Sequence, residues 1–237
     1  MFPLKDNVPT RGFPVVTVAL IATNFAVWVF YQLPHLNRSV VEYAYQPCEV
    51  ASSCPPGTAV GHGWFVTAFT SMFMHGSWLH IIGNMLFLWI FGNNVEDAMG
   101  RARFLVFYLL AGLIAIAAQT VVTLAVGTNV DAAVPTLGAS GAVSGVLGAY
   151  LVLLPTASVL TLIFFFILEV PAFLFLGFWF GFQLWEGGFS IVQPQAGGGV
   201  AFFAHIGGFA LGVVVGLLLR VVGAGTERRG PGLTSMG

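Results

Sequence analysis

The sequence predicts an all-α polytopic membrane protein built as a bundle of six transmembrane helices. Charged residues make up 7% and hydrophobic residues 57% of the 237 residues, whereas about 25% of an ordinary soluble domain is charged. Six stretches that carry at most one charged residue each are also long enough, or nearly so, to provide the roughly 20 residues with which a helix crosses a membrane. A soluble fold is therefore excluded, and the length fits one domain.

The expected spans are separated by charged residues, glycine or proline. In order, they are 13–33, 77–95, 104–126, 140–154, 159–185 and 200–222. The fourth covers only about 22 Å as a helix, so Ser140 is expected below the outer surface, in a depression lined by the loop 132–138. We expect residues 1–12 to form an N-terminal segment, 13–222 the membrane domain and 223–237 a C-terminal tail.

The basic residues predict the orientation, because cytoplasmic loops are enriched in Lys and Arg. Seven of the 8 lie on one side: Lys5, Arg11, Arg101, Arg103, Arg220, Arg228 and Arg229. Both termini are therefore expected in the cytoplasm of a prokaryote, with the protein in its plasma membrane. Residues 1–11 lack the pattern of a removable signal peptide. A net charge of -1 provides no basic face for nucleic acid.

The only two cysteines, Cys48 and Cys54, lie in the expected outer loop between the first two spans. That compartment permits a disulfide between them. A zinc site that also uses His62 is an alternative, although it lacks a fourth ligand. Two free buried thiols are the other alternative.

Strongly polar side chains inside a membrane are costly unless they face the bundle interior. Five such residues lie near the outer ends of spans two, four and six: His75, His80, Asn84, Ser140 and His205. His80 and Asn84 share one helix face. His75 would lie about 140° around a helix from His80, so one face cannot present both as ligands of a metal or haem. His75 is expected either to support the outer loop or to have a functional role.

Spans four and six each carry a stripe of glycines at helical spacing. Span four has Gly141, Gly145 and Gly148, and span six has Gly208, Gly212 and Gly216 below His205. Small residues let helix backbones approach closely. The two stripes therefore predict that Ser140 comes within hydrogen-bonding distance of His205.

A serine beside a histidine is the nucleophile and general base of acyl transfer. Around Ser140 the sequence reads Gly138-Ala-Ser-Gly141, which is not the G-x-S-x-G elbow of soluble hydrolases. The amide of Ser140 and the side chains of His80 and Asn84 are expected to stabilise an oxyanion. No carboxylate is obviously placed to orient His205, so we favour a dyad over a triad.

These motifs resemble the rhomboid intramembrane serine proteases. The resemblance rests on His75-Gly-Ser-Trp-Leu-His80-Ile-Ile-Gly-Asn84, Gly138-Ala-Ser140-Gly141 and Ala204-His205-Ile-Gly-Gly208, in this order over residues 13–222. It implies Ser140 as nucleophile, His205 as base, and His80, Asn84 and the Ser140 amide as oxyanion donors, supported by Gly138, Gly141 and His75. It also implies transmembrane protein substrates in the lipid bilayer, cut near their outer ends, with no metal or cofactor. The oligomeric state is left open.

The chain departs from some bacterial members at three positions. Ser144 replaces a tyrosine that stacks on the catalytic histidine, and Val66 and Thr67 replace a Trp-Arg pair. Glu96 matches a structural glutamate that follows span two. The resemblance also suggests that the fifth span moves aside to admit substrate, at Phe178 and Trp179.

Two other functions remain as alternatives. Glu169 is expected near the middle of span five, where a transporter would place a proton relay, although a structural glutamate beside Pro171 is favoured. A non-catalytic rhomboid-like binder of transmembrane helices is the second. Such binders lack the serine or the histidine, whereas Ser140 and His205 are both present here.

Overall fold

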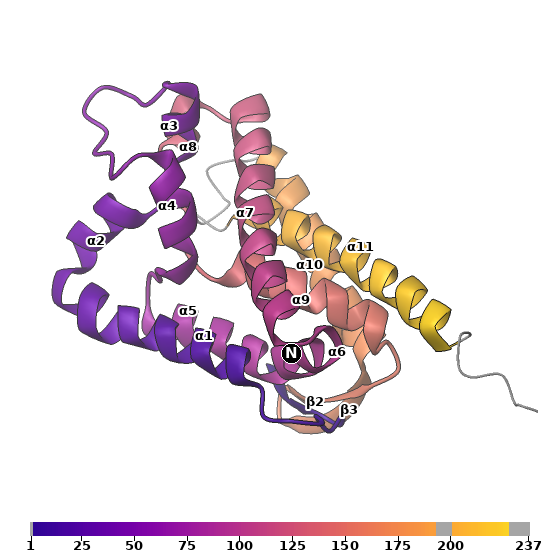
Figure 1. Cartoon of the computed structure of the whole chain (residues 1–237). Coiled ribbons are helices and arrows are strands. Elements are labelled where there is room, and N and C mark those ends of the chain that lie inside the picture. Colours follow the sequence, from indigo (N-terminus) through magenta and orange to yellow (C-terminus); the bar gives the residue numbers. More distant parts are fainter. Residues whose placement is uncertain (1, 193–200, 228–237) are drawn as a thin grey trace, which may run out of the picture.

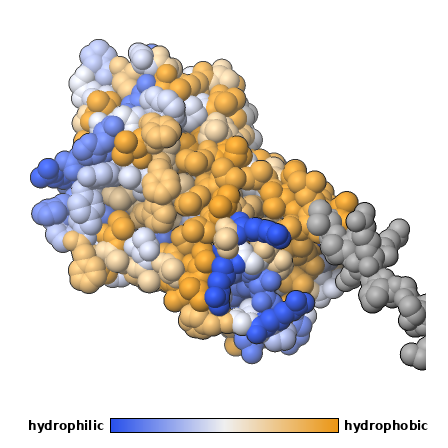
Figure 2. Space-filling view, in the orientation of Figure 1, coloured by the Kyte–Doolittle hydropathy of each residue, from blue (hydrophilic) through white to orange (hydrophobic). Residues whose placement is uncertain are grey.

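The computed structural model describes residues 2–192 and 201–227. Helices form most of the molecule, and a small antiparallel sheet lies at one end (Figure 1). The centre consists of α7 (Arg101–Val126), α9 (Ser140–Leu153) and α11 (Phe202–Glu227), which pack on one another. Apolar side chains cover the middle of the face seen in Figure 2, with hydrophilic side chains gathered on either side. This pattern fits a protein surrounded by lipid.

The first expected span is one long helical run. Helix α1 (Val15–Ala26) continues through a π-helical turn (Val27–Gln32) and a 3-10 turn (Leu33–His35) into α2 (Leu36–Tyr43). Glu96 accepts hydrogen bonds from the backbone N–H groups of Val16 and Thr17, at 3.0 and 2.8 Å. These are groups that a helix start leaves unpaired. The buried Glu96 therefore has the structural role expected of it, at the start of α1.

The second expected span is helical but interrupted. It comprises α5 (Trp78–Phe87), a π-helical turn (Leu88–Gly92) and α6 (Asn93–Met99). The loop before it contains α3 (Pro47–Ala51), α4 (Trp64–Thr70) and a 3-10 turn (Ser71–Phe73). Cys48 and Cys54 are joined there by a disulfide. This loop and the sheet lie at opposite ends of the molecule (Figure 1).

Within the described residues, three helical runs are by themselves long and apolar enough to cross a membrane. They are Val15–Tyr43, Arg101–Val126 and Phe202–Val221. Helix α9 is shorter, with 14 residues, or about 21 Å. The count of six spans stays a prediction.

The prediction of a fifth span over residues 159–185 is wrong in its first half. Residues Ser158–Ile163 form β2 and Phe166–Pro171 form β3, an antiparallel hairpin. Strand β1 (Phe2–Asp6) pairs with the other edge of β2. Only then does α10 (Ala172–Val192) begin. A run that is apolar throughout has no periodicity to separate strand from helix, and its β-branched and aromatic residues favour a strand.

The hairpin also changes the position of Glu169. Its side chain is exposed on β3, opposite Leu160, and not inside a membrane helix. The proton-relay argument for a transporter therefore loses its basis. At the hairpin tip, Phe164 has a left-handed backbone (φ 53°) and Phe165 is 94% exposed. Such turns usually select glycine or asparagine, so the aromatic tip is not explained by turn chemistry.

The expected close approach of two glycine stripes is confirmed. A Cβ atom added to Gly212 would overlap the carbonyl oxygen of Gly145 and lie 2.8 Å from the backbone nitrogen of Ala149. Gly208 meets the Gly141 carbonyl in the same way. Helices α9 and α11 are thus in backbone contact, which brings their N-terminal ends together.

Candidate active site

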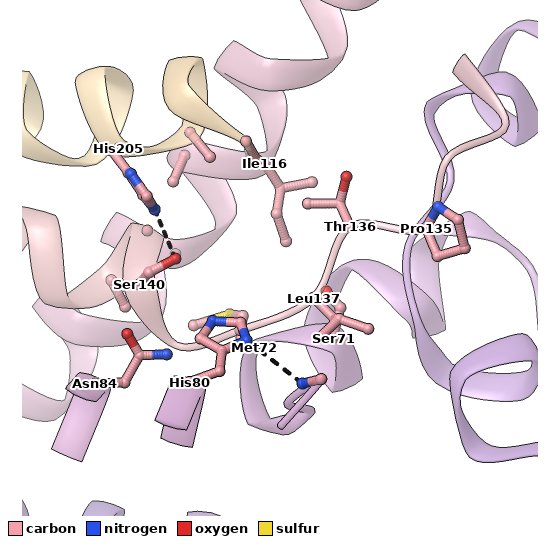
Figure 3. Close-up of a pocket in the computed structure, with 18 residues that line it drawn as sticks. Ser71, Met72, His80, Asn84, Ile116, Pro135, Thr136, Leu137, Ser140 and His205 are labelled. Carbon is pink, nitrogen blue, oxygen red and sulfur yellow. Dashed lines mark hydrogen bonds between the residues drawn. The ribbon is translucent and has the colours of Figure 1, made fainter. Parts of the chain in front are cut away.

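Four of the five polar residues singled out in the sequence surround one cavity of about 450 Å³ (Figure 3). Ser140 comes from α9, His205 from α11, and His80 and Asn84 from α5. The loop 135–138 forms another wall of the cavity, so the expected depression lined by this loop is present. Residues from three helices and a loop therefore converge at one place.

Ser140 and His205 are in direct contact. The hydroxyl of Ser140 lies 2.8 Å from Nε2 of His205. Ser140 is the first residue of α9, and the preceding loop is anchored by the Gly138 N–H, which donates to the Ser71 carbonyl at 2.9 Å. Gly138 has φ 127°, a conformation that glycine adopts at no steric cost. This turn lets the chain start α9 with Ser140 at the cavity.

His80 presents a nitrogen to the same space. Its Nδ1 accepts a hydrogen bond from the Gly76 backbone N–H at 3.4 Å, drawn in Figure 3. A neutral imidazole that accepts at Nδ1 carries its proton on Nε2. Nε2 lies against the Gly138 backbone, where an added Cβ would come within 2.7 Å of it. His80 therefore offers an N–H donor beside Ser140.

Asn84 supplies a second donor. Its side-chain nitrogen is buried and has no hydrogen-bond partner among the described residues. A buried unpaired donor costs free energy and calls for an explanation. A negative oxygen formed in the cavity would provide the missing partner.

His75 contacts His80. This contact contradicts the expectation that the two side chains point in different directions. The two imidazoles are 5.1 Å apart, edge to face, although helical spacing was expected to separate them. The reason is that α5 begins at Trp78, so His75 is a loop residue. Its backbone N–H donates to the Gln32 side chain at 2.8 Å. His75 thus connects the loop to the first helical run.

Sequence reasoning missed Gln183 of α10, and it named Trp179 only for a movement of the fifth span and not as a neighbour of His205. Gln183 places its side-chain oxygen 2.8 Å from Nδ1 of His205, and the ring of Trp179 lies 6.1 Å from the imidazole at 37°. Ser144, at the position of the stacking tyrosine, instead donates to the Ser140 carbonyl at 2.6 Å. A polar residue in an apolar helix was the signal that identified His205, and the same signal could have identified Gln183.

The protein has long apolar helices around a cavity in which a serine hydroxyl contacts an imidazole. It is therefore a helical membrane protein with a serine–histidine site. The chain belongs to the rhomboid family, because the Rhomboid domain matches residues 62–221. This confirms the resemblance found in the sequence motifs.

Relatives of this chain occur in mitochondria and bacteria. Rhomboid protein 1, mitochondrial, of Saccharomyces cerevisiae is 30% identical over 205 residues, 84% of this chain and 51% of the yeast protein. The human Presenilin-associated rhomboid-like protein, mitochondrial, is 30% identical over 136 residues, 57% of this chain and 32% of that protein. The candidate rhomboid protease YdcA of Bacillus subtilis is 30% identical over 155 residues, 64% and 69% of the two chains. The chain spans about half the length of its yeast relative.

Proposed function

We propose that this protein is an intramembrane serine endopeptidase that cuts transmembrane proteins. The observation that carries the proposal is the 2.8 Å contact between Ser140 Oγ and His205 Nε2, inside a cavity that also holds the unpaired side-chain nitrogen of Asn84. A serine with a base and a separate anion site has the parts that acyl transfer requires.

In the proposed reaction, Nε2 of His205 removes the hydroxyl proton as Ser140 Oγ attacks the scissile carbonyl. The carbonyl oxygen becomes negative and accepts hydrogen bonds from Asn84, His80 Nε2 and the Ser140 amide. His205 then protonates the leaving amine, which departs and leaves an acyl ester on Ser140. A water molecule, deprotonated by His205, attacks the ester, and the product acid leaves with the serine hydroxyl restored.

Transmembrane substrates are supported by a second cavity, of about 270 Å³, that opens between α5 and α10. Its lining is mainly apolar, and it reaches both Ser140 and His205. Six residues form most of the apolar lining: Leu79, Phe87, Val143, Leu147, Trp179 and Gly83. An apolar segment could therefore approach the serine from the lipid side. Phe178, which is 65% exposed on α10, would face that segment if α10 moves aside.

The proposal includes the arrangement of the chain in the membrane. Residues 13–222 would form the membrane domain with six crossings, and both termini would lie in the cytoplasm, because the basic residues gather on that side. The loop with the Cys48–Cys54 disulfide would then lie outside. A bacterial plasma membrane agrees with this orientation.

The proposal is tested with purified full chain in liposomes and a panel of single-span protein substrates. The wild type is expected to cut at least one substrate within or near its membrane span, and Ser140→Ala to cut none. Ser144→Ala removes another serine hydroxyl from the same helix and is the matched control, expected to retain cleavage. Cleavage by the Ser140→Ala protein would refute the proposal, and binding without cleavage by the wild type would point to a non-catalytic binder.

A further inference from the structure

His205 makes a hydrogen bond through each of its ring nitrogens. Nε2 meets Ser140 Oγ and Nδ1 meets Oε1 of Gln183, both at 2.8 Å. Gln183 is buried, with 7% of its surface exposed. It belongs to α10, whereas the serine begins α9 and the histidine lies in α11. Three helices therefore meet at this imidazole.

The chemistry of these partners decides where the ring proton sits. A neutral imidazole has a proton on one nitrogen and a lone pair on the other. The carbonyl oxygen of Gln183 has no hydrogen to donate, so Nδ1 must carry the proton and donate it. Nε2 then directs its lone pair at the hydroxyl of Ser140, which is the form that a general base requires.

We propose that Gln183 is a positioning residue that holds His205 in the Nδ1-protonated tautomer and fixes the ring orientation. The inference rests on the proposed function, in which His205 is the base. In serine–histidine–aspartate sites a buried carboxylate does this work. In this protein the Gln183 amide faces a mainly apolar cavity with Leu79, Phe87 and Trp179 in its wall. Burying a carboxylate there costs more free energy than burying a neutral amide that is hydrogen-bonded to Nδ1.

The acceptor comes from a different helix than either Ser140 or His205. Helix α10 is held against α11 by Phe180, which stacks on Phe209 with ring centroids 4.2 Å apart. If α10 separates from α11, His205 loses its acceptor at Nδ1 and its ring becomes free to turn. Proton transfer therefore depends on the docked position of α10.

The test uses two variants of Gln183 in the full chain. Gln183→Met keeps the length of the side chain but removes the acceptor, and Gln183→Glu keeps an oxygen that accepts from Nδ1. Gln119→Met is the matched control, because Gln119 also faces α11 but accepts from the Ala204 N–H at 3.2 Å and not from His205.

The first readout is the tautomer itself. Protein with ¹⁵N-labelled histidine is reconstituted in lipid bilayers at pH 8, and the His205 signals are assigned by their loss in His205→Asn. The wild type, Gln183→Glu and Gln119→Met are expected to show a protonated Nδ1 and an unprotonated Nε2. Gln183→Met should show a mixture of the two tautomers. A purely structural role of Gln183 would leave the tautomer unchanged.

The second readout is turnover of a single-span substrate. Losing the partner that orients a metal-binding histidine typically costs about 10- to 100-fold. By analogy, Gln183→Met should lower kcat by a similar factor with little change in KM. Gln183→Glu should restore most of the rate. An unchanged tautomer and kcat in Gln183→Met would overturn the inference while wild-type cleavage still supported the proposed function. If the wild type cut nothing, the proposed function would fail and the tautomer measurement would still decide the role of Gln183.

Discussion

Replacing Gly212 with alanine tests whether backbone contact between α9 and α11 sets the Ser140–His205 geometry. The new Cβ atom would overlap the Gly145 carbonyl oxygen and lie 2.8 Å from the Ala149 nitrogen, whereas ordinary contact begins at 3.4 Å. The helices must therefore separate by more than about half an ångström, because neither obstacle is a movable side chain. A separation approaching 1 Å would stretch the 2.8 Å hydrogen bond between Ser140 and His205, and a misplacement of about 1 Å can cost 10²-fold in rate.

Helix propensity works in the opposite direction, since alanine is favoured over glycine in a helix by about 1 kcal/mol. A loss of activity would therefore come from the displaced helices. Active-site labelling by a serine-directed fluorophosphonate and the melting temperature should be measured on the same preparations. Gly181→Ala is the control, because nothing lies within 4 Å of the added Cβ atom on α10. An unchanged labelling rate per folded Gly212→Ala molecule would refute the reasoning.

The other predictions concern the anion site, the outer loop and the hairpin. Asn84→Ala should lower kcat by about 10²- to 10³-fold with the fold intact, and a wild-type rate would remove Asn84 from the oxyanion site. Alkylation of unreduced, denatured protein should modify neither Cys48 nor Cys54, since they form a disulfide; two modified thiols would contradict the bridge. An environment-sensitive fluorophore attached to the cysteine of Phe165→Cys should report an apolar medium and be quenched by spin-labelled lipid. The reason is that native Phe165 is 94% exposed, and burial of its ring in lipid is favourable. The same label on Lys5→Cys should stay in water, and equal quenching at both sites would argue against contact of the hairpin tip with lipid.

The sequence was sufficient to predict that Ser140, His205, His80 and Asn84 lie together, because each is a polar group in an apolar segment. A membrane makes such residues costly, so their number is small and their spacing is informative. The glycine stripes then indicated which helices touch, and the structure has that contact. These inferences depend on composition and helical spacing, both of which can be read along the chain.

The hairpin could not be predicted by the same means. A mainly apolar segment satisfies the length and composition of a membrane helix as well as those of a strand. Its β-branched and aromatic residues favour a strand, but the pairing with β1 is what establishes it. That partner lies more than 150 residues away in the sequence. The position of His75 was also predicted wrongly. Helical spacing was applied to it, although α5 begins three residues later, at Trp78.

The contact between Gln183 and His205 could not be predicted from the sequence for a different reason. Its contact with His205 joins residues 22 positions apart on two helices, and the rotation of α10 about its axis decides which side chain faces α11. That rotation depends on how the aromatic rings of α10 pack, including Phe180 on Phe209. Nearly every position of α10 is apolar, so the sequence alone gives little information about which face is buried.

The central claim is that the Ser140 hydroxyl, activated by His205, is the nucleophile of this protein. The most direct measurement is mass-spectrometric mapping of the residue modified when the folded wild-type protein reacts with a fluorophosphonate. One adduct is expected, on Ser140, which is lost in Ser140→Ala and strongly reduced in His205→Asn, because the base that removes the hydroxyl proton is gone. An adduct that persists in Ser140→Ala, or an unmodified Ser140 in a preparation that cuts its substrate, would contradict the claim.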